Sequence, residues 1–245
     1  MKDSRIRILS TRPLSDALIE KAALDNIRVE TATFIEVRKL VTPEVESKIL
    51  GLALLPATVV FTSMNAVEKV VETIKPAADA FPDWKIYCLG GSSFTLVKKY
   101  WPYNNIVATA KNAGDLARRI VSDKAGEVHF FCGNIRREEL PELLRNENVL
   151  VNEYVVYETI HTPVKVEDNY DAVLFFSPSA ADSFFSLNNV PAETVLFAIG
   201  ATTAATLKKH CTNNVVIGEF PAKEQLVEKA VEYFKGEREK IKNTK

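Results

Sequence analysis

The sequence predicts a two-lobed α/β protein in which each lobe contains a parallel sheet covered by helices. Three observations support this fold class. Apolar runs of strand length alternate with amphipathic runs of about 8 to 15 residues, which is typical of parallel sheets with helices on both faces. Three of these strand-and-turn units occur twice along the chain. The length of 245 residues is also sufficient for two domains that each bury a core.

The internal repeat matches three apolar runs with three others about 110 to 120 residues further along. Each run stops in a short turn rich in serine, threonine or glycine. The matched segments are 59–66 with 173–180, 86–93 with 196–203 and, more loosely, 6–12 with 128–134. Two similar lobes with facing polar loops imply that one ligand is held between them.

In the first half of the chain, proline and apolar spacing mark the helices. One helix follows Pro13 and another follows Pro43. A third has apolar residues at i, i+3, i+4 and i+7 from Val67, and Asn65 with Glu68 resembles a capping box at its start. The remaining elements expected here are strands at 6–9, 59–62, 85–89 and 106–108 and helices at 93–100 and 113–122.

The second half continues the alternation on the same grounds. Strands are expected at 128–131, 172–176, 195–199 and 215–217, and helices at 136–146, 179–187, 203–210 and 223–234. Two extended segments, 29–37 and 152–161, are interrupted by polar residues and look less buried than the other strands. We interpret them as a pair of connecting strands that form the hinge between the lobes.

The amino-acid composition narrows the classes of function that we expect for this protein. The formal net charge of −1 and the isoelectric point of about 6.4 give no bulk positive field, so we expect neither nucleic acid nor a membrane surface as a partner. The first residues lack a signal-peptide core, and no apolar run approaches membrane-spanning length. Three cysteines without metal-site spacing are expected to be buried free thiols. These features predict a cytoplasmic protein.

The turns after the strands are the candidate binding groups. In an open parallel sheet, ligands bind beyond the carboxyl ends of the strands. Free backbone N–H groups at a helix start, together with hydroxyl groups beside them, accept anions such as carboxylates. Each hydroxyl could equally be a simple helix cap, and only the recurrence at matched places favours a shared cleft. The residues in question are Ser63, Asn65, Ser93, Ser177, Thr202 and Thr203.

Other side chains leave alternatives open. Arg12 lies in a turn and could bind a carboxylate in bidentate fashion. Arg136 and Arg137 precede two glutamates, so pairing within a helix is favoured for them. Tyr157 lies in the second extended segment, where its phenol could be plain packing or could reach a ligand as a hydrogen-bond donor or weak acid.

Several familiar motifs are missing. The glycine pair Gly90-Gly91 lacks the rest of a dinucleotide fingerprint, and there is no Walker-type stretch. The histidines His129, His161 and His210 have no ligand-like spacing. The sequence therefore favours a protein without a cofactor or metal.

Five of the motifs, taken in order, are similar to those of a known family. They are Phe61-Thr62-Ser63-Met64-Asn65-Ala66-Val67, Cys132-Gly133-Asn134-Ile135-Arg136-Arg137-Glu138-Glu139-Leu140-Pro141, Val156-Tyr157-Glu158-Thr159, Phe176-Ser177-Pro178-Ser179 and Ile199-Gly200-Ala201-Thr202-Thr203-Ala204. In this order they cover nearly the whole chain and resemble the uroporphyrinogen-III synthase family.

The resemblance implies two flavodoxin-like, doubly wound lobes joined by a two-stranded connector. Lobe 1 would be discontinuous, from 1–34 plus 164–245, and lobe 2 would span 39–152, with connectors at about 29–38 and 153–163. It also implies a reaction without cofactor or metal: the linear tetrapyrrole hydroxymethylbilane loses water, and its terminal pyrrole ring inverts through a spiro intermediate as the macrocycle closes. We also expect a monomer, to which the preceding bilane-forming enzyme could pass the substrate directly.

Roles for individual residues follow from the same resemblance. Tyr157 matches the linker tyrosine and is expected to assist departure of the hydroxyl group. The expected substrate-binding residues are Arg12, Ser63, Ser93, Asn134, Ser177, Ser179, Thr202 and Thr203. Ser93 lies where many members have threonine, a change that keeps the hydroxyl. Since the substrate carries eight carboxylates, many modest donors could replace one strongly basic pocket.

Two other classes of function remain open on the sequence alone. One is a binding module that closes on a small anionic ligand without chemistry. The other is an impaired paralogue that acts as a regulatory domain. The intact turns and Tyr157 favour the enzyme, and no appended partner-binding domain supports the regulator.

Overall fold

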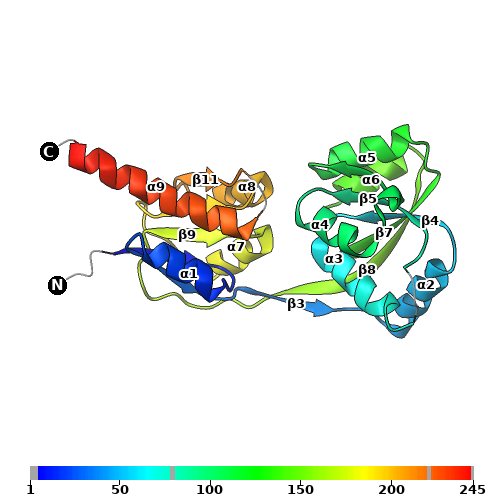
Figure 1. Ribbon diagram of the computed structural model, residues 1–245, viewed down its shortest axis with the longest axis horizontal. Coiled ribbons are helices and arrows are strands. Elements are labelled where there is room, and N and C mark those ends of the chain that lie inside the picture. Colours follow the sequence, from blue (N-terminus) through cyan, green and yellow to red (C-terminus); the bar gives the residue numbers. More distant parts are fainter. Residues whose placement is uncertain (1–4, 78–80, 220–221, 244–245) are drawn as a thin grey trace. The chain divides into compact units, whose positions relative to one another are not determined.

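The computed structural model describes residues 5–77, 81–219 and 222–243 (Figure 1). The chain divides into two compact units: unit 1 comprises Met1–Glu36 and Ile160–Lys245, and unit 2 comprises Val37–Thr159. Each unit contains one sheet dominated by parallel strands, with helices on both of its faces. The predicted fold class, an α/β protein with two parallel-sheet lobes, is confirmed.

Unit 1 contains a five-stranded sheet in the order β11-β10-β9-β1-β2. All four strand pairs are parallel. Its strands are β1 (Ile6–Ser10), β2 (Ile27–Thr31), β9 (Ala172–Phe175), β10 (Val195–Ala198) and β11 (Val215–Ile217), and its helices are α1 (Asp16–Ala23), α7 (Pro178–Phe185), α8 (Ala201–His210) and α9 (Lys223–Asn243).

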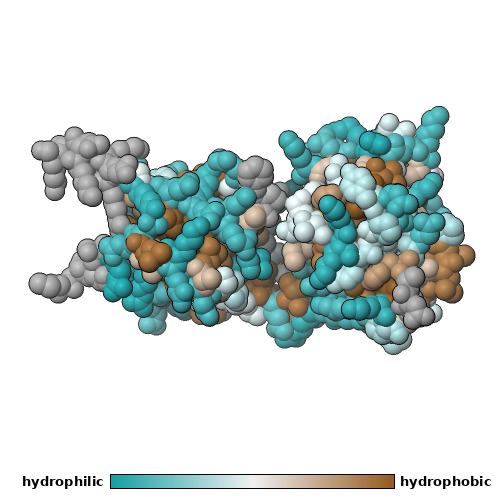
Figure 2. All heavy atoms as spheres, viewed as in Figure 1, coloured by the Kyte–Doolittle hydropathy of each residue, from teal (hydrophilic) through white to brown (hydrophobic). Residues whose placement is uncertain are grey.

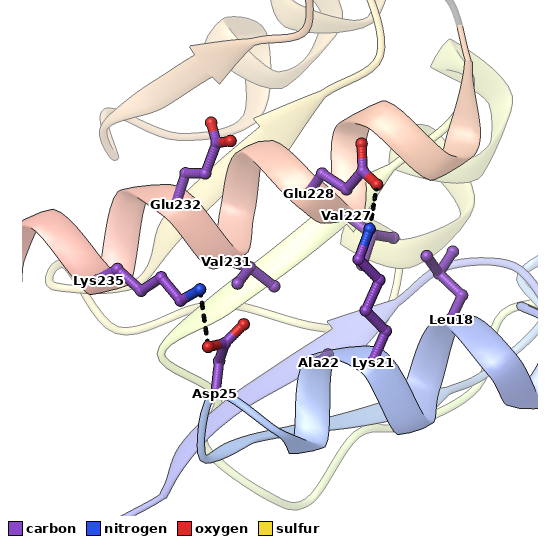
Figure 3. A pocket seen from close by; sticks show the side chains of 9 residues that line it. All are labelled: Leu18, Lys21, Ala22, Asp25, Val227, Glu228, Val231, Glu232 and Lys235. Atoms are coloured by element: carbon purple, nitrogen blue, oxygen red, sulfur yellow. Dashed lines mark hydrogen bonds and ion pairs between the residues drawn. The ribbon is translucent and has the colours of Figure 1, made fainter.

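Alternating side chains of this sheet enter two separate cores. Ile8 packs with α1 and α9 on one face, whereas its neighbour Leu9 packs with α7 and α8 on the other. The central strands therefore read as continuous apolar runs, because both of their faces are covered. On one face α1 and α9 pack against each other, and two ion pairs, Lys21–Glu228 and Lys235–Asp25, link them (Figure 3).

The second sheet, most of which belongs to unit 2, has six strands in the order β3-β8-β7-β4-β5-β6. Val59 and Phe61 of β4 belong to the core under α2, α3 and α4, and Val60 belongs to the core under α5 and α6. The strands are β3 (Ile35–Lys39), β4 (Ala57–Phe61), β5 (Trp84–Leu89), β6 (Ile106–Ala110), β7 (Glu127–Gly133) and β8 (Leu150–His161), and the helices are α2 (Pro43–Ala53), α3 (Met64–Ile74), α4 (Ser92–Tyr100), η1 (Tyr103–Asn105), α5 (Ala113–Ser122) and α6 (Glu139–Asn146).

The two sheets share one strand order, which accounts for the internal repeat. Reading β6-β5-β4-β7-β8 in unit 2 against β11-β10-β9-β1-β2 in unit 1 places each repeated segment at the same position. Strand β4 corresponds to β9, β5 to β10 and β7 to β1. In unit 2 the strands β7, β4 and β5 are adjacent, as β1, β9 and β10 are in unit 1. Because the strands are parallel, their three polar turns meet at one edge of each sheet.

The expected connecting segments overlap strands of the two sheets. The first, 29–37, contains two strands: β2 pairs with β1 inside unit 1, and β3 pairs with β8. Strand β3 runs antiparallel to β8, since Leu40 N–H donates to the Val156 carbonyl and Thr162 N–H to that of Phe34. The second, 152–161, is not a free connector along its whole length, because β8 pairs in parallel with β7 from Leu150 to Tyr157. Its polar residues lie in a strand that is partly exposed.

Several helix boundaries also differ from the sequence prediction, and three of them are informative. Helix α3 is capped by Ser63, whose Oγ accepts from the N–H of Asn65 at 3.2 Å, so Asn65 is inside the helix. Helix α6 begins at Glu139 instead of residue 136, because the preceding residues form a loop bound to β8. Helix α9 continues to Asn243, past the expected end at 234.

Candidate active site

In unit 2, three turns lie at the carboxyl ends of the adjacent strands β7, β4 and β5. They contain Asn134, Ser63 and the pair Gly90-Gly91 respectively. The turns after β4 and β5 lead directly into α3 and α4, so free backbone N–H groups face this edge of the sheet. The site therefore combines hydroxyl, amide and backbone donors in one unit.

Tyr157 lies beside these turns, near the end of the β7–β8 pairing. Its side chain belongs to the core under α3, and the residue is 7% exposed. The side chains of Ser63 and Asn65 lie near enough to the phenol oxygen to hydrogen-bond with it. Burial raises the pKa of the Tyr157 phenol above its ordinary value, because it disfavours the phenolate, and these two side chains oppose the rise only in part. The phenol is therefore in its protonated form at neutral pH.

Asn134 is exposed, but its side-chain oxygen already accepts two hydrogen bonds from the backbone. Asn134 Oδ1 accepts from the backbone N–H groups of Ile135 and Thr159, both at 2.8 Å. The backbone N–H of Asn134 donates to the Tyr157 carbonyl at 3.1 Å. The side chain thus ties the turn after β7 to the strand that carries Tyr157. A contact with substrate through the amide nitrogen stays a prediction.

Ser93 lies in the first turn of α4 and is 6% exposed. The helix begins after Gly91, whose φ of 73° is in the left-handed region that a residue with a side chain rarely adopts. Gly90 N–H donates to the Ala110 carbonyl at 2.9 Å, which fixes the turn to β6. The Ser93 hydroxyl is therefore held at the same edge of the sheet as Ser63.

In unit 1, Arg12 follows β1 and is exposed. Its guanidinium lies over the ring of Phe176, 5.6 Å from the centroid. The neighbouring Thr11 is 1% exposed, and its hydroxyl donates to the Leu174 carbonyl at 2.8 Å. Ser10 Oγ in turn donates to the Arg12 carbonyl at 2.6 Å. Two buried hydroxyls that the sequence reading missed thus hold the backbone on either side of the Arg12 turn.

The other predicted residues of unit 1 lie at the starts of α7 and α8. Ser177 caps α7, with its Oγ accepting from Ala180 N–H at 3.1 Å, and Ser179 is half-buried in the first turn. Thr202 and Thr203 are in the first turn of α8 after Gly200, and Thr203 is 2% exposed. Strands β1, β9 and β10 are adjacent, so the structure brings the Arg12, Ser177 and Thr203 turns to one edge of the sheet. Their contact with substrate stays a prediction.

The predicted helix pairing of Arg136 and Arg137 is wrong in one respect. Arg136 precedes α6 and, besides a 3.2 Å contact with Glu138, its Nε lies 2.5 Å from Oε2 of Glu153 on β8. Glu153 also pairs with Arg145. Because Glu153 is distant from Arg136 in sequence, no local spacing could have identified this partner.

The cysteines and the membrane question are separate from this site. Cys88 and Cys132 are buried, and desolvation raises the pKa of each thiol to about 12, so neither is a thiolate at neutral pH. In the described part of the chain, no three His, Cys, Asp or Glu side chains are grouped to bind a metal ion. Across the same residues, no helix has both the length and the apolar character needed to cross a membrane.

Two surface pockets lie elsewhere in the units and contain none of the predicted site residues. One, of about 290 Å³, lies between α1 and α9 and is crossed by the ion pairs of Lys21 and Lys235 (Figure 3). The other, of about 660 Å³, lies between α2 and the end of α3, in a region where Figure 2 shows hydrophobic surface. Leu54 lines it and is 85% exposed.

Comparison with known proteins gave a family match and several structural matches. The model of the family "Uroporphyrinogen-III synthase HemD" matches residues 17–228. No match was found among curated proteins. A mutant uroporphyrinogen III synthase from the extremely thermophilic bacterium Thermus thermophilus is similar in structure, with 13% identity, a TM-score of 0.65 and coverage of 93% of this chain and 98% of that one.

Two further solved structures have the same fold. Uroporphyrinogen-III synthetase from Helicobacter pylori is 16% identical, with a TM-score of 0.60 and coverage of 94% of this chain and 99% of that one. The wild-type Thermus thermophilus protein is 15% identical, with a TM-score of 0.56 and coverage of 95% of this chain and 99% of that one. Because the sequence identities are this low, the structural matches show only that the fold is the same. The match to the family model shows the family.

Proposed function

Since this chain belongs to the uroporphyrinogen-III synthase family, it is a cyclising lyase that converts hydroxymethylbilane into uroporphyrinogen III, and we propose that Tyr157 assists the loss of water in that reaction. The reaction starts when the terminal hydroxymethyl group loses its hydroxyl and leaves a cationic azafulvene. Hydroxide is a poor leaving group, so a donor placed against its oxygen lowers the barrier. The phenol of Tyr157 is the candidate donor.

The surroundings of Tyr157 suit this role. Burial raises the pKa of the phenol, and the nearby side chains of Ser63 and Asn65 offset part of this rise. Burial keeps the phenol protonated, and its high pKa makes it a hydrogen-bond donor more than a strong acid. The observation that carries the proposal is this buried, doubly held phenol beside three polar turns.

We further propose that the turns of each unit bind acetate and propionate groups of the substrate. The hydroxyls of Ser63, Ser93, Ser177 and Thr203 lie at or next to helix starts, where free N–H groups and the helix dipole favour anions. The remaining proposed contacts come from Arg12, Asn134, Ser179 and Thr202. Holding the chain in one conformation allows the substituted carbon of the last pyrrole ring to attack, so positioning supplies much of the rate and the isomer selectivity.

Arg12 is the cationic member of this set. Its guanidinium lies over the Phe176 ring, 5.6 Å from the centroid. A guanidinium of this kind can bind a substrate carboxylate through two parallel hydrogen bonds. We propose that it binds one of the acidic side chains of the tetrapyrrole.

The test of Tyr157 is the variant Tyr157→Phe, which removes the phenol oxygen and keeps the ring. We expect formation of the type III isomer to slow by about 10- to 1000-fold, the range for the loss of one proton donor. The assay supplies hydroxymethylbilane, oxidises the products and separates the type I and type III porphyrins. The matched control is Tyr87→Phe, which removes another buried phenol of unit 2, one that donates to Asp123 at 2.9 Å.

The two variants separate chemistry from folding. Wild-type activity in a folded Tyr157→Phe protein would remove Tyr157 from the mechanism, and an equal loss in Tyr87→Phe would attribute the effect to stability. For the wild-type chain, a type III to type I ratio no different from that without protein would contradict the enzymatic reading itself.

We also propose that the protein acts as a cytoplasmic monomer and receives hydroxymethylbilane directly from the enzyme that forms it. The bilane closes spontaneously to the type I isomer, so direct transfer would limit that loss. Sedimentation velocity gives the mass for comparison with 27.3 kDa. A coupled assay diluted at a constant enzyme ratio tests the transfer, because type I product should rise with dilution only if the bilane passes through bulk water.

A further inference from the structure

The pairing of β7 and β8 contains an irregularity just before Tyr157. The register runs one to one from Glu127 with Leu150 to Cys132 with Val155, and then shifts so that Gly133 is opposite Tyr157. Val156 is the extra residue of this β-bulge. The irregularity is confined to the end of the ladder that carries the candidate site.

The bulge changes the face on which Tyr157 lies. Side chains in a regular strand alternate between faces, and Val155 packs in the core under α5 and α6. Val156 and Tyr157, although consecutive, both belong to the core under α3. In a regular strand Tyr157 would share the face of Val155, away from Ser63 and Asn65. The extra residue therefore brings the phenol to its two hydrogen-bonding partners.

Gly133 leaves the space that the tyrosine ring occupies. A Cβ added to Gly133 would lie 2.5 Å from Cζ of Tyr157, 2.6 Å from Cε2 and 2.9 Å from the phenol oxygen. Real Cβ atoms do not approach other atoms this closely, so even alanine would displace the ring. The backbone angles give Gly133 no left-handed conformation, which means that the missing side chain, and not the backbone angle, is the reason for glycine here.

The residue after Gly133 secures the strand beyond the bulge. Asn134 N–H donates to the carbonyl of Tyr157, and Asn134 Oδ1 accepts the N–H of Thr159. These bonds hold the strand at Tyr157 and just beyond it, and they replace the ladder that the bulge interrupts. The adjacent Arg136–Glu153 ion pair joins the same loop to β8 earlier in the strand.

We propose that Gly133 and Asn134 are positioning residues that aim the Tyr157 phenol, Gly133 by leaving room for the ring and Asn134 by holding the bulged strand through its carboxamide oxygen. This inference rests on the proposed function of Tyr157. It assigns to Asn134 a task distinct from binding substrate. In this role Gly133 and the carboxamide oxygen of Asn134 act through Tyr157 and not on the substrate.

The test of Gly133 is Gly133→Ala, with Gly126→Ala as its matched control. Gly126 immediately precedes the same strand, and an added Cβ there meets nothing within 4 Å. We expect Gly133→Ala to lower kcat for the type III isomer by about 100-fold with a much smaller change in KM, as for a displacement of the order of 1 Å. In the Tyr157→Phe background the same substitution should cost less than about threefold, because the donor is already absent.

Two further measurements separate positioning from general damage. Gly133→Ala should lower the Tm by about 5 °C in the wild-type background and by much less when Tyr157→Ala has removed the ring. In protein labelled with ¹³C at the tyrosine ring, the resonance lost in Tyr157→Phe should titrate at lower pH in Gly133→Ala, since the displaced phenol is less buried.

Asn134 is tested by two substitutions that give opposite predictions for its two roles. Asn134→Asp keeps an oxygen that can accept both N–H groups, whereas Asn134→Ala removes it. Positioning predicts that Asp retains most of the activity that Ala loses. Binding a substrate carboxylate through the amide N–H predicts that Asp is at least as harmful as Ala, because it removes the donor and adds a negative charge.

The outcomes distinguish this inference from the proposed function. Wild-type activity in Tyr157→Phe overturns the role of Tyr157 in the reaction, and the positioning role with it. Additive Tm losses for Gly133→Ala and Tyr157→Ala, or an Asn134→Asp variant no better than Asn134→Ala, overturn the positioning role while leaving Tyr157 as the donor. If Gly133→Ala does not fold, the Asn134 pair still decides between the outcomes.

Discussion

Replacing Ser63 by alanine removes two interactions at once. The expected loss of unfolding free energy is therefore large enough to be divided between them. Ser63 Oγ caps α3 by accepting from Asn65 N–H, and the same side chain lies near enough to the Tyr157 phenol to hydrogen-bond with it. Loss of a serine cap costs about 1 kcal/mol. Loss of one hydrogen bond at the buried phenol costs about 1 kcal/mol more. We therefore expect Ser63→Ala to lower the free energy of unfolding of unit 2 by about 2 kcal/mol.

The natural control is another hydroxyl cap in the same unit. Thr42 Oγ1 caps α2 by accepting from Val45 N–H at 3.3 Å, and its contact is with the backbone alone. Thr42→Ala should cost about 1 kcal/mol. In a double-mutant cycle with Tyr157→Phe, Ser63→Ala should cost about 1 kcal/mol less than in the wild-type background, and Thr42→Ala should cost the same in both.

The chain offers a selective probe for this measurement. It has two tryptophans, Trp84 and Trp101, and both are buried in the core of unit 2. Their emission therefore reports the unfolding of that unit in urea. With a slope of about 2 kcal/mol per molar, the loss expected for Ser63→Ala lowers the midpoint by about 1 M. Equal losses for Ser63→Ala and Thr42→Ala, with no coupling in the cycle, would refute the hydrogen bond to Tyr157.

Two other predictions use pKa shifts. Burial lowers the pKa of His129, whose Nδ1 lies 3.0 Å from the Tyr154 hydroxyl, so the unfolded chain takes up a proton before the folded one. Stability of unit 2 should fall as the pH drops from about 6.5 toward the lowered pKa, and this dependence should be weaker in His129→Gln. Urea midpoints measured at several pH values test this, and equal slopes in the two proteins would contradict it. The thiols of Cys88 and Cys132 are buried and have a pKa of about 12, so both should resist alkylation by iodoacetamide at a pH of about 8 and react once urea unfolds the chain. Peptide mass analysis locates the label, and rapid labelling of either cysteine in the native protein would show that its burial is wrong.

Most of the fold followed from local patterns. The apolar spacing from Val67 predicted α3, and the segment 113–122 was predicted with the boundaries that α5 has. These predictions succeeded because helix periodicity and capping depend on residues within a few positions of each other. The start of α6 was predicted three residues early, because the loop before it is held by β8, a distant segment.

The candidate site was predictable only as a set of turns. Ser63, Ser177 and Thr203 were selected because each follows an apolar strand in a repeated unit, and the structure places each at a strand end beside its neighbours. The contacts of Asn65 with Tyr157 and of Arg136 with Glu153 were not predictable, since they join residues that a local pattern cannot relate.

The sequence by itself determined two parallel-sheet lobes, the repeat that relates them and the polar turns at the strand ends, because these depend on the alternation of apolar and polar residues along short stretches. Only the tertiary structure decided which face of β8 carries Tyr157 and why Gly133 has no side chain. The physical reason is that a one-residue bulge reverses the facing of every later side chain, and its position depends on hydrogen bonds between strands that are distant in sequence.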